Sequence, residues 1–207
     1  DALLCRHKSG RRTLGAADQI TLEFAGAFRH YHAAMMQTVV VGAPTPRHEE
    51  LFAAARSALD AVEETMRPGR TFGDVFDAHA HAIDEAGLHG ARMNACGYSL
   101  GATFTPCWMD PPMFYKDNPA EIVPDMVLFA HMILMDSPTG TAMTLGRTYL
   151  TTDGVESTDE PPREGHLVHE FSVPDGEYHV FGRVRAPAGD SDSFWFRVDD
   201  GDWIRWD

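Results

Sequence analysis

The sequence has few basic residues, few cysteines and no long apolar run. Lys and Arg together number 17 against 31 Asp and Glu, which gives a formal net charge of −14 at pH 7. Nucleic-acid binders neutralise phosphates with clustered Lys and Arg, so this composition argues against a nucleic-acid partner. Cys5, Cys96 and Cys107 are too few and too irregularly spaced for a disulfide framework or a zinc site. No apolar segment approaches the roughly 20 residues that span a bilayer.

These absences predict a protein of a reducing compartment with no membrane partner, and we expect a cytoplasmic location. The 207 residues are enough to bury one core and leave room for a second, smaller unit. The chain opens on Asp1, without a methionine and inside a pattern, so we expect an upstream piece to be missing.

The first regular structure is predicted to be a β-hairpin. Residues 19–24 alternate apolar and polar side chains, with Glu23 on the polar face. The Ala-Gly-Ala that follows is expected to turn the chain back into a second strand over residues 28–41. This hairpin would place Glu23 opposite Tyr31 and His32.

Two helices are predicted next. The first covers residues 46–66 and has a proline near its start; the second is capped by Thr71 and ends at Gly87. His79 and His81 lie two positions apart on the second helix and therefore point to different sides. We expect surface or boundary histidines here, because this spacing argues against a shared metal.

The centre of the chain is predicted to be a buried strand over residues 126–136, which is apolar except for His131 and ends in Asp136. Before it lies Tyr98, which is flanked by glycines at 97 and 101. Another strand is expected to begin at Met143 and to close on Asp153-Gly154.

The composition changes after residue 156. Residues 157–163 are predicted to be a polar linker, and residues 164–207 read as several short strands separated by turns. We expect a separate β-rich unit at this end of the chain.

The order of these motifs resembles the catalytic domain of the pita-bread family, which includes methionine and Xaa-Pro aminopeptidases and creatinase. The resemblance covers roughly three quarters of the chain and rests on the hairpin, the helix that ends at Pro68-Gly69, the Gly97–Gly101 loop and the Pro124-Asp125 strand entry. It implies an α+β fold: a truncated, N-terminally incomplete pita-bread domain over residues 1–156, followed by a short all-β segment. It also implies a homodimer.

The peptidases of that family bind two metal ions through two aspartates, a histidine and two glutamates. The resemblance aligns these five ligands with Glu23, Ala34, Tyr98, His131 and approximately Leu145. Hard divalent cations need convergent oxygen ligands, and alanine and leucine supply none. We therefore expect no metal and no other cofactor.

A closer resemblance is to the ectoine hydrolases. It is carried by the Gly-Tyr-Ser-Leu-Gly loop, Trp108-Met109-Asp110, Phe114-Tyr115, Asn118-Pro119 and the segment from His131 to Asp136. It implies metal-independent hydrolysis of a small zwitterion, the cyclic amidine of ectoine or hydroxyectoine, to an N-acetyl-diaminobutyrate.

Three residues are catalytic candidates for that chemistry. Glu23 is the candidate nucleophile or general base, His131 the candidate general acid or base, and Tyr98 the candidate donor to a developing charge. Each also has a structural interpretation: a paired carboxylate, a core histidine and a packing tyrosine.

The candidate substrate-binding residues are aromatic or charged. Trp108 and Phe114 are expected to stack on the planar cation and Asp110 to pair with it, unless the two rings only fill the core. The remaining candidates are His32 and Tyr31, on the strand opposite Glu23.

Two alternatives remain open. The first is a metal-dependent Xaa-Pro dipeptidase, and the second is a catalytically silent protein that binds a small zwitterion or, through its tail, a glycan. The tail from Gly176 to Trp203 resembles a fragment of a jelly-roll carbohydrate-binding module, although its tryptophans fit a sandwich core equally well.

Overall fold

The structure is a computed structural model that describes residues 13–29, 31–103, 107–151, 194–196, 201–202 and 204–206. The chain divides into two compact units, residues 1–153 and residues 154–207. The two units are described separately. The predicted domain limits at residues 156 and 164, and the linker between them, stay predictions.

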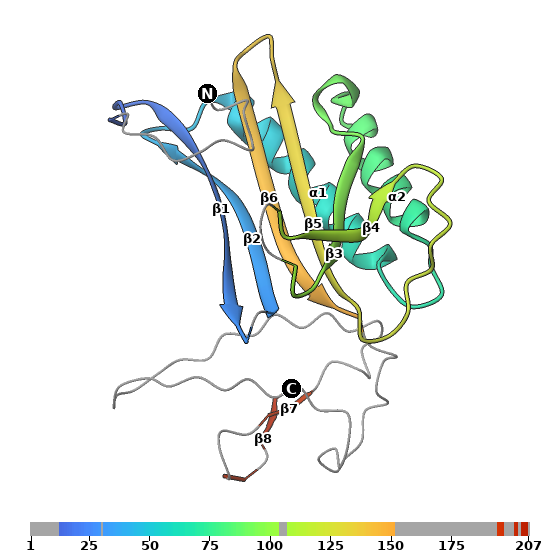
Figure 1. The fold of residues 1–207 in the computed structure, drawn as a ribbon. Coiled ribbons are helices and arrows are strands. Elements are labelled where there is room, and N and C mark those ends of the chain that lie inside the picture. The colour runs from blue at the N-terminus through green and yellow to red at the C-terminus, as the bar shows by residue number, and fades with distance from the viewer. Residues whose placement is uncertain are drawn as a thin grey trace. The chain divides into compact units, whose positions relative to one another are not determined.

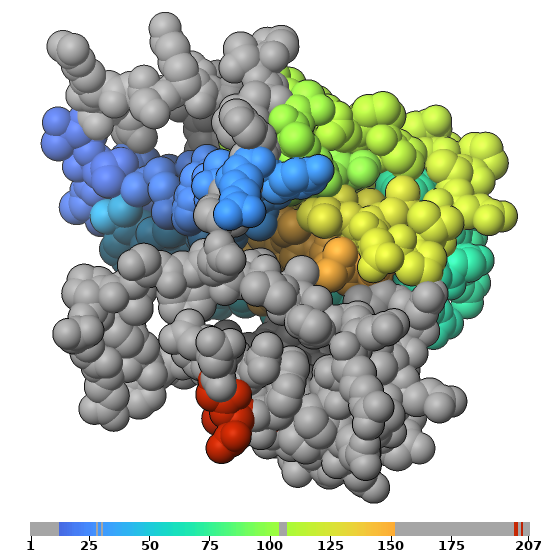
Figure 2. All heavy atoms as spheres, turned by 60° about the horizontal axis from the view of Figure 1, so that its bottom comes forward, coloured from blue at the N-terminus to red at the C-terminus, as the bar shows by residue number. Residues whose placement is uncertain are grey.

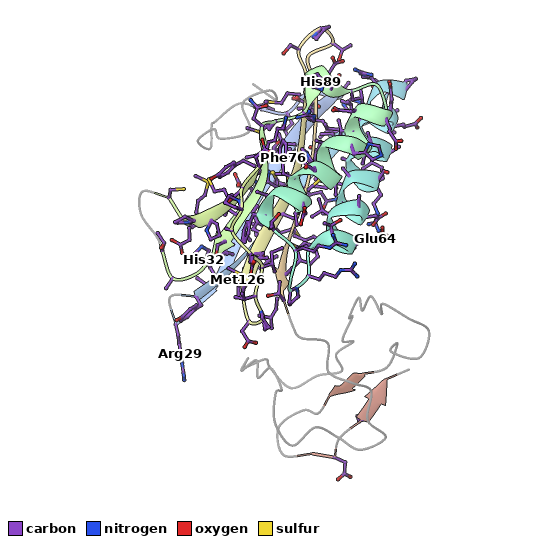
Figure 3. The ribbon with its side chains drawn as sticks, turned by 90° about the vertical axis from the view of Figure 1, so that its right-hand side faces the viewer. Arg29, His32, Glu64, Phe76, His89 and Met126 are labelled. Atoms are coloured by element: carbon purple, nitrogen blue, oxygen red, sulfur yellow. The ribbon has the colours of Figure 1, made fainter. Side chains whose placement is uncertain are left out.

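The predicted hairpin is present, but its turn is not where the sequence indicated. Strand β1 (Asp18–Phe28) pairs with β2 (Tyr31–Val41) in an antiparallel ladder. The strand does not turn at residues 25–27, because Ala25 continues the ladder opposite Ala34. The chain reverses instead at Arg29, which takes the left-handed φ of 49° and points away from the sheet (Figure 3).

This shift in the turn changes the register of the hairpin. Glu23 lies opposite Met36, and Ala27 lies opposite His32. The prediction that Glu23 faces Tyr31 and His32 is therefore wrong: its partner Met36 lies four to five positions further along the second strand. The reason is that the turn comes later than predicted, so the first strand is longer.

Both predicted helices are confirmed. Helix α1 (Pro46–Thr65) begins at the N-cap Thr45, and α2 (Phe72–Glu85) begins at Thr71, whose hydroxyl accepts from the Asp74 amide over 3.0 Å. The short helix η1 (His89–Ala91) follows. The expectation for His79 is wrong: its side chain is buried, because it lies on the sheet-facing side of α2 beside Phe76.

Six strands of the first unit form one sheet in the order β1-β2-β6-β5-β3-β4. The four not yet named are β3 (Ala95–Leu100), β4 (Met109–Tyr115), β5 (Val127–Asp136) and β6 (Thr141–Leu150). Strand β5 is buried along most of its length and lies inside the sheet, as its apolar run predicts.

The sheet has one face covered by helices and one opposite face. Helices α1 and α2 pack on the first face and contribute Leu51, Leu59, Phe72 and Ile83 to the larger hydrophobic core (Figure 1). The second face carries a smaller buried cluster from strands β2, β3 and β5, with Ala34, Met36, Tyr98, Leu100, Phe129 and Ile133. This second face is called the inner face below. The mixed α+β class is as predicted.

Asp136, at the end of the buried strand, has a structural role. It accepts a hydrogen bond from Arg47 Nε over 2.8 Å, and Thr139 also donates to it. The Arg47 guanidinium therefore lowers the pKa of this carboxyl, with a smaller contribution from Thr139. The pair joins the end of β5 to the first turn of α1.

The second unit is described only in part. Strands β7 (Phe194–Phe196) and β8 (Ile204–Trp206) pair antiparallel, as the pattern of residues 193–206 predicts. The rest of the predicted β-rich tail lies outside the described residues, and its likeness to a carbohydrate-binding module stays a prediction. Within the described ranges, none of the helices is both long and apolar enough to cross a membrane.

Candidate functional site

Five aromatic and imidazole rings gather on the inner face of the sheet. Tyr98 lies at the centre, with ring centroids 5.5 Å from both Phe129 and His131. Phe129 and His131 are 5.7 Å apart, and Trp108 lies 5.7 Å from His32. We call His32, Tyr98, Trp108, Phe129 and His131 the ring cluster. Four of these five were site candidates in the sequence.

Phe129 is the member that sequence reasoning missed. It lies two residues before His131 on β5, and residues two apart on a strand face the same side. The two-residue spacing from His131 was the signal in the sequence that could have identified Phe129. Because this strand is apolar on both faces, the spacing alone does not indicate which face carries a site.

Trp108 connects two distant parts of the sheet. His32 is on β2 and Tyr98 is on β3, which are three strand spacings apart in the sheet order, or about 14 Å in a flat sheet. Trp108 reaches both: it contacts the His32 ring, and its Nε1 donates to the Tyr98 hydroxyl over 3.0 Å. Trp108, directly before β4, therefore lies over the inner face. In Figure 2 the hairpin, in blue, and the segment around β4, in yellow, lie beside part of β6, in orange.

The position opposite His131 is a glycine. In the ladder between β5 and β6, His131 pairs with Gly146, and Met132 pairs with Leu145. Leu145 packs against the helix-side core, so it faces away from the ring cluster. The match of the second glutamate to approximately Leu145 stays a prediction, and the neighbouring residue that shares the inner face with His131 is Gly146.

Glu23 lies on the inner face at some distance from His131. The ladders connect Glu23 to Met36, Met36 to Gly146 and Gly146 to His131. These three spacings amount to about 14 Å along a flat sheet. The two catalytic candidates thus stand on the same face, separated by β2 and β6.

Besides Glu23, three candidates are not brought into the ring cluster. Phe114 is completely buried on the helix side, where it stacks on Phe72 at 4.6 Å. Tyr31 alternates with the buried His32 and is 66% exposed. Asp110 is half-buried at the edge of the sheet and accepts a hydrogen bond from Thr103. The structure therefore gives Phe114 a packing role and leaves Tyr31 on the outer face of the hairpin.

His79, a buried histidine on α2 beneath the site, is held in its neutral form. Burial in the core lowers the pKa of His79 to about 4, and the positive charge of Arg92 and the nearby His131 add to the effect. Its Nδ1 is buried without a hydrogen-bond partner in the described part of the chain. His79 is therefore neutral at pH 7 and lies behind the sheet that carries His131.

The residues on the inner face do not fit a pair of divalent cations. At the aligned ligand positions stand Glu23, Ala34, Tyr98, His131 and, by register, Gly146. A Cβ at Gly146 would lie 2.8 Å from Phe129 Cζ and 2.9 Å from Met36 Cβ, so a larger side chain has no room there. In the described ranges no three His, Cys, Asp or Glu side chains form a group able to hold a metal ion.

Comparison with known proteins agrees with this fold. The chain is 30% identical over 131 residues to an uncharacterized hydrolase/peptidase of Sinorhizobium fredii, covering 63% of this chain and 32% of that protein. It is 31% identical over 115 residues to the ectoine hydrolase of Halomonas elongata, covering 53% and 27%. The chain thus spans about a third of the length of these relatives.

Solved structures show the same architecture. The prolidase of Pyrococcus furiosus matches with a TM-score of 0.67 at 18% identity, over 73% of this chain and 43% of that chain. The model of the metallopeptidase family M24 matches residues 1–153. The match covers the whole first unit, with its antiparallel sheet and two helices, and the chain belongs to the metallopeptidase family M24.

Proposed function

We propose that the inner face is the site of a metal-independent hydrolase that opens the cyclic amidine of ectoine or hydroxyectoine to an N-acetyl-diaminobutyrate. The observation that carries the proposal is the placing of His131, a titratable imidazole, among buried aromatic rings at a position that the resemblance assigns to a metal-binding glutamate. The similarity to an ectoine hydrolase supports the substrate class.

The donor set supports the absence of metal from the reaction. Gly146 and Ala34 replace two expected carboxylates, and the space beside Gly146 is filled by Phe129 and Met36. Without convergent oxygen ligands, the candidate residues on this face offer two imidazoles, a phenol and one carboxylate. Those groups are suited to proton transfer and to hydrogen bonding.

The reaction assigns one role to each of three groups. A water oxygen bonds to the ring carbon between the two nitrogens as Glu23 accepts one of the water protons. The C–N bond then breaks as His131, in its protonated form, gives a proton to the departing nitrogen, while the second water proton leaves the new carbonyl oxygen and ends on the released amine, which becomes an ammonium. Tyr98 donates a hydrogen bond to the charge that develops. Glu23 and His131 share the inner face with Met36 and Gly146 between them, so the proposal requires the substrate to lie over these two positions with Glu23 and His131 at its two ends.

The binding of the substrate uses the remaining rings and charge. The electron-rich faces of the ring cluster suit a delocalised cation, a contact worth about 1 to 2 kcal/mol when water is excluded. Asp110, at the sheet edge, is the nearest of the proposed carboxylates to Trp108 in the chain. We leave Phe114 and Tyr31 out of the site because of where the structure places them. The enzyme is proposed to work as a cytoplasmic homodimer.

The proposal is tested by proton NMR of ectoine incubated with the purified chain. The wild-type chain is expected to produce an acetyl-diaminobutyrate signal, and Glu23→Gln is expected to slow it at least 100-fold, since general acid-base groups contribute about 10² to 10⁴ in rate. Glu64→Gln, the same change on the exposed side of α1 (Figure 3), is the matched control and should retain the wild-type rate.

Three results would contradict the proposal. Turnover of ectoine that is unaffected in Glu23→Gln would remove Glu23 from the mechanism. Cleavage of a Xaa-Pro dipeptide with no action on ectoine would assign the site to peptide hydrolysis, and binding of ectoine without turnover by the wild-type chain would make it a binding site.

A further inference from the structure

Trp108 is held by its ring edge as well as by its ring face. Its indole nitrogen donates to the Tyr98 hydroxyl over 3.0 Å, while its ring is tilted by 54° against His32. An indole N–H is only a donor, so in this hydrogen bond the Tyr98 oxygen is the acceptor. The proton of the Tyr98 hydroxyl must therefore point somewhere other than toward Trp108.

The surroundings of Tyr98 determine how strongly its hydroxyl can donate a hydrogen bond. Tyr98 is completely buried, and its ring contacts Phe129 on one side and His131 on another. In such an environment water competes little for the hydroxyl. Accepting one hydrogen bond also polarises a hydroxyl and makes it a better donor. The indole N–H thus both orients and strengthens the hydroxyl donor of Tyr98, whose ring lies beside that of His131.

We infer that Trp108 is a positioning residue that acts through Tyr98: its N–H directs the Tyr98 hydroxyl proton to the side of the ring cluster where the substrate is proposed to react. This inference rests on the proposed function for the reaction it serves. It replaces stacking on the substrate cation as the role of Trp108, because the indole is already engaged by Tyr98 at its edge and by His32 at its side.

The two roles predict different kinetics. Trp108→Phe keeps an aromatic ring and loses the N–H. If Trp108 positions Tyr98, this variant lowers kcat by about fivefold and leaves KM within twofold of the wild-type value, since one neutral hydrogen bond is worth about 1 kcal/mol. If Trp108 stacks on the substrate, the same variant raises KM, because a benzene ring is a weaker cation binder than indole.

A double-mutant cycle tests whether Trp108 acts through Tyr98. Tyr98→Phe removes the hydroxyl, so adding Trp108→Phe to it should cause no further loss of kcat. Additive losses would overturn the inference. Tyr115→Phe, which removes a hydroxyl from an exposed tyrosine of β4, is the matched control and should retain the wild-type rate.

A readout without substrate separates this inference from the proposed function. The indole N–H signal of Trp108 is identified as the one that is missing from the proton NMR spectrum of Trp108→Phe. That signal should exchange slowly with water in the wild-type chain and exchange faster and shift upfield in Tyr98→Phe. If it does not change in Tyr98→Phe, the inference is wrong whether or not the chain is active. If it changes but no ectoine is hydrolysed, the proposed function fails and the positioning of Tyr98 by Trp108 stands.

Discussion

Gly146 lies directly opposite His131 in the ladder that joins β5 and β6. This pairing defines what the inner face offers to a ligand: an imidazole on one strand and no side chain on the next. The space above Gly146 is occupied by the Phe129 ring and by Met36. The same contacts that exclude a carboxylate from this position hold the aromatic floor of the site together.

Gly146→Ala should therefore destabilise the protein. The new Cβ would come within 2.8 Å of Phe129 Cζ and 2.9 Å of Met36 Cβ, so the ring and the neighbouring strand have to shift. We expect a loss of about 1 to 3 kcal/mol in the free energy of unfolding, measured by urea denaturation.

Gly26→Ala is the control for this substitution. Gly26 also lies in a strand, but a Cβ there would meet nothing within 4 Å. Because alanine costs less conformational entropy than glycine in a strand, this variant should be neutral or slightly stabilised. Equal destabilisation by both variants would show that the contacts around Gly146 are not the cause.

His79 should make the protein sensitive to acid. Its pKa is lowered to about 4 in the folded protein, against an ordinary value of 6.5, so the unfolded chain binds more protons between these pH values. Stability contributed by the neutral ring is complete above pH 6.5 and is lost as the pH falls toward 4, by about 3 kcal/mol in all.

The variant pair His79→Leu and His81→Leu measures this contribution. His81 lies on the same helix but is exposed, with Glu85 3.4 Å away. Urea unfolding at pH 7 and at pH 4.5 should show a smaller loss of stability for His79→Leu than for the wild-type chain, and the wild-type loss for His81→Leu. The same acid sensitivity in all three proteins would contradict the assignment to His79.

Asp136→Asn should remove a second element of pH dependence, which has the same sign as that of His79 but acts in a more acidic range. The pKa of Asp136 is lowered by Arg47 and Thr139, so its carboxylate stabilises the fold above the ordinary carboxyl pKa, and this contribution is lost as the pH falls through the lowered value. The variant should be less stable than wild type at pH 7 and approach it at strongly acidic pH.

Thermal unfolding across pH tests this expectation, with Asp60→Asn as the control. Asp60 forms a partly exposed pair with Arg56 one turn away on α1, and such pairs near the surface contribute little. A constant difference between Asp136→Asn and wild type at every pH would show that the effect is not due to the charge.

Several elements of the first unit could be predicted because each carries a local signal. Thr71 caps α2, a proline opens α1, and the apolar run around His131 forms a buried strand. Strands β3 and β4 were not predicted, and most of the Gly97–Gly101 stretch, expected to be a loop, lies in β3. The position of the hairpin turn could not be predicted, because Ala25 and Gly26 tolerate either strand or turn. A left-handed arginine at position 29 is not a pattern that sequence alone favours.

The site was predictable as a set of residue types but not as an arrangement. His131, Tyr98, Trp108 and His32 meet on one face, yet which face of β5 carries His131 depends on the helices that cover the other. Phe114 was placed wrongly among the site residues for the same reason: an aromatic residue beside a tryptophan motif fits a site and a core equally well. Register assigned Gly146, rather than Leu145, to the inner face.

The most direct test of the account is metal removal followed by assay. The chain would be dialysed against a chelator and its hydrolysis of ectoine measured by proton NMR, before and after the addition of Mn²⁺, Co²⁺ or Zn²⁺, with a Xaa-Pro dipeptide as the second substrate. The account predicts the same rate of ectoine hydrolysis with and without added metal, and no dipeptide cleavage. Activity on either substrate that is lost in chelator and restored by a divalent cation would contradict it.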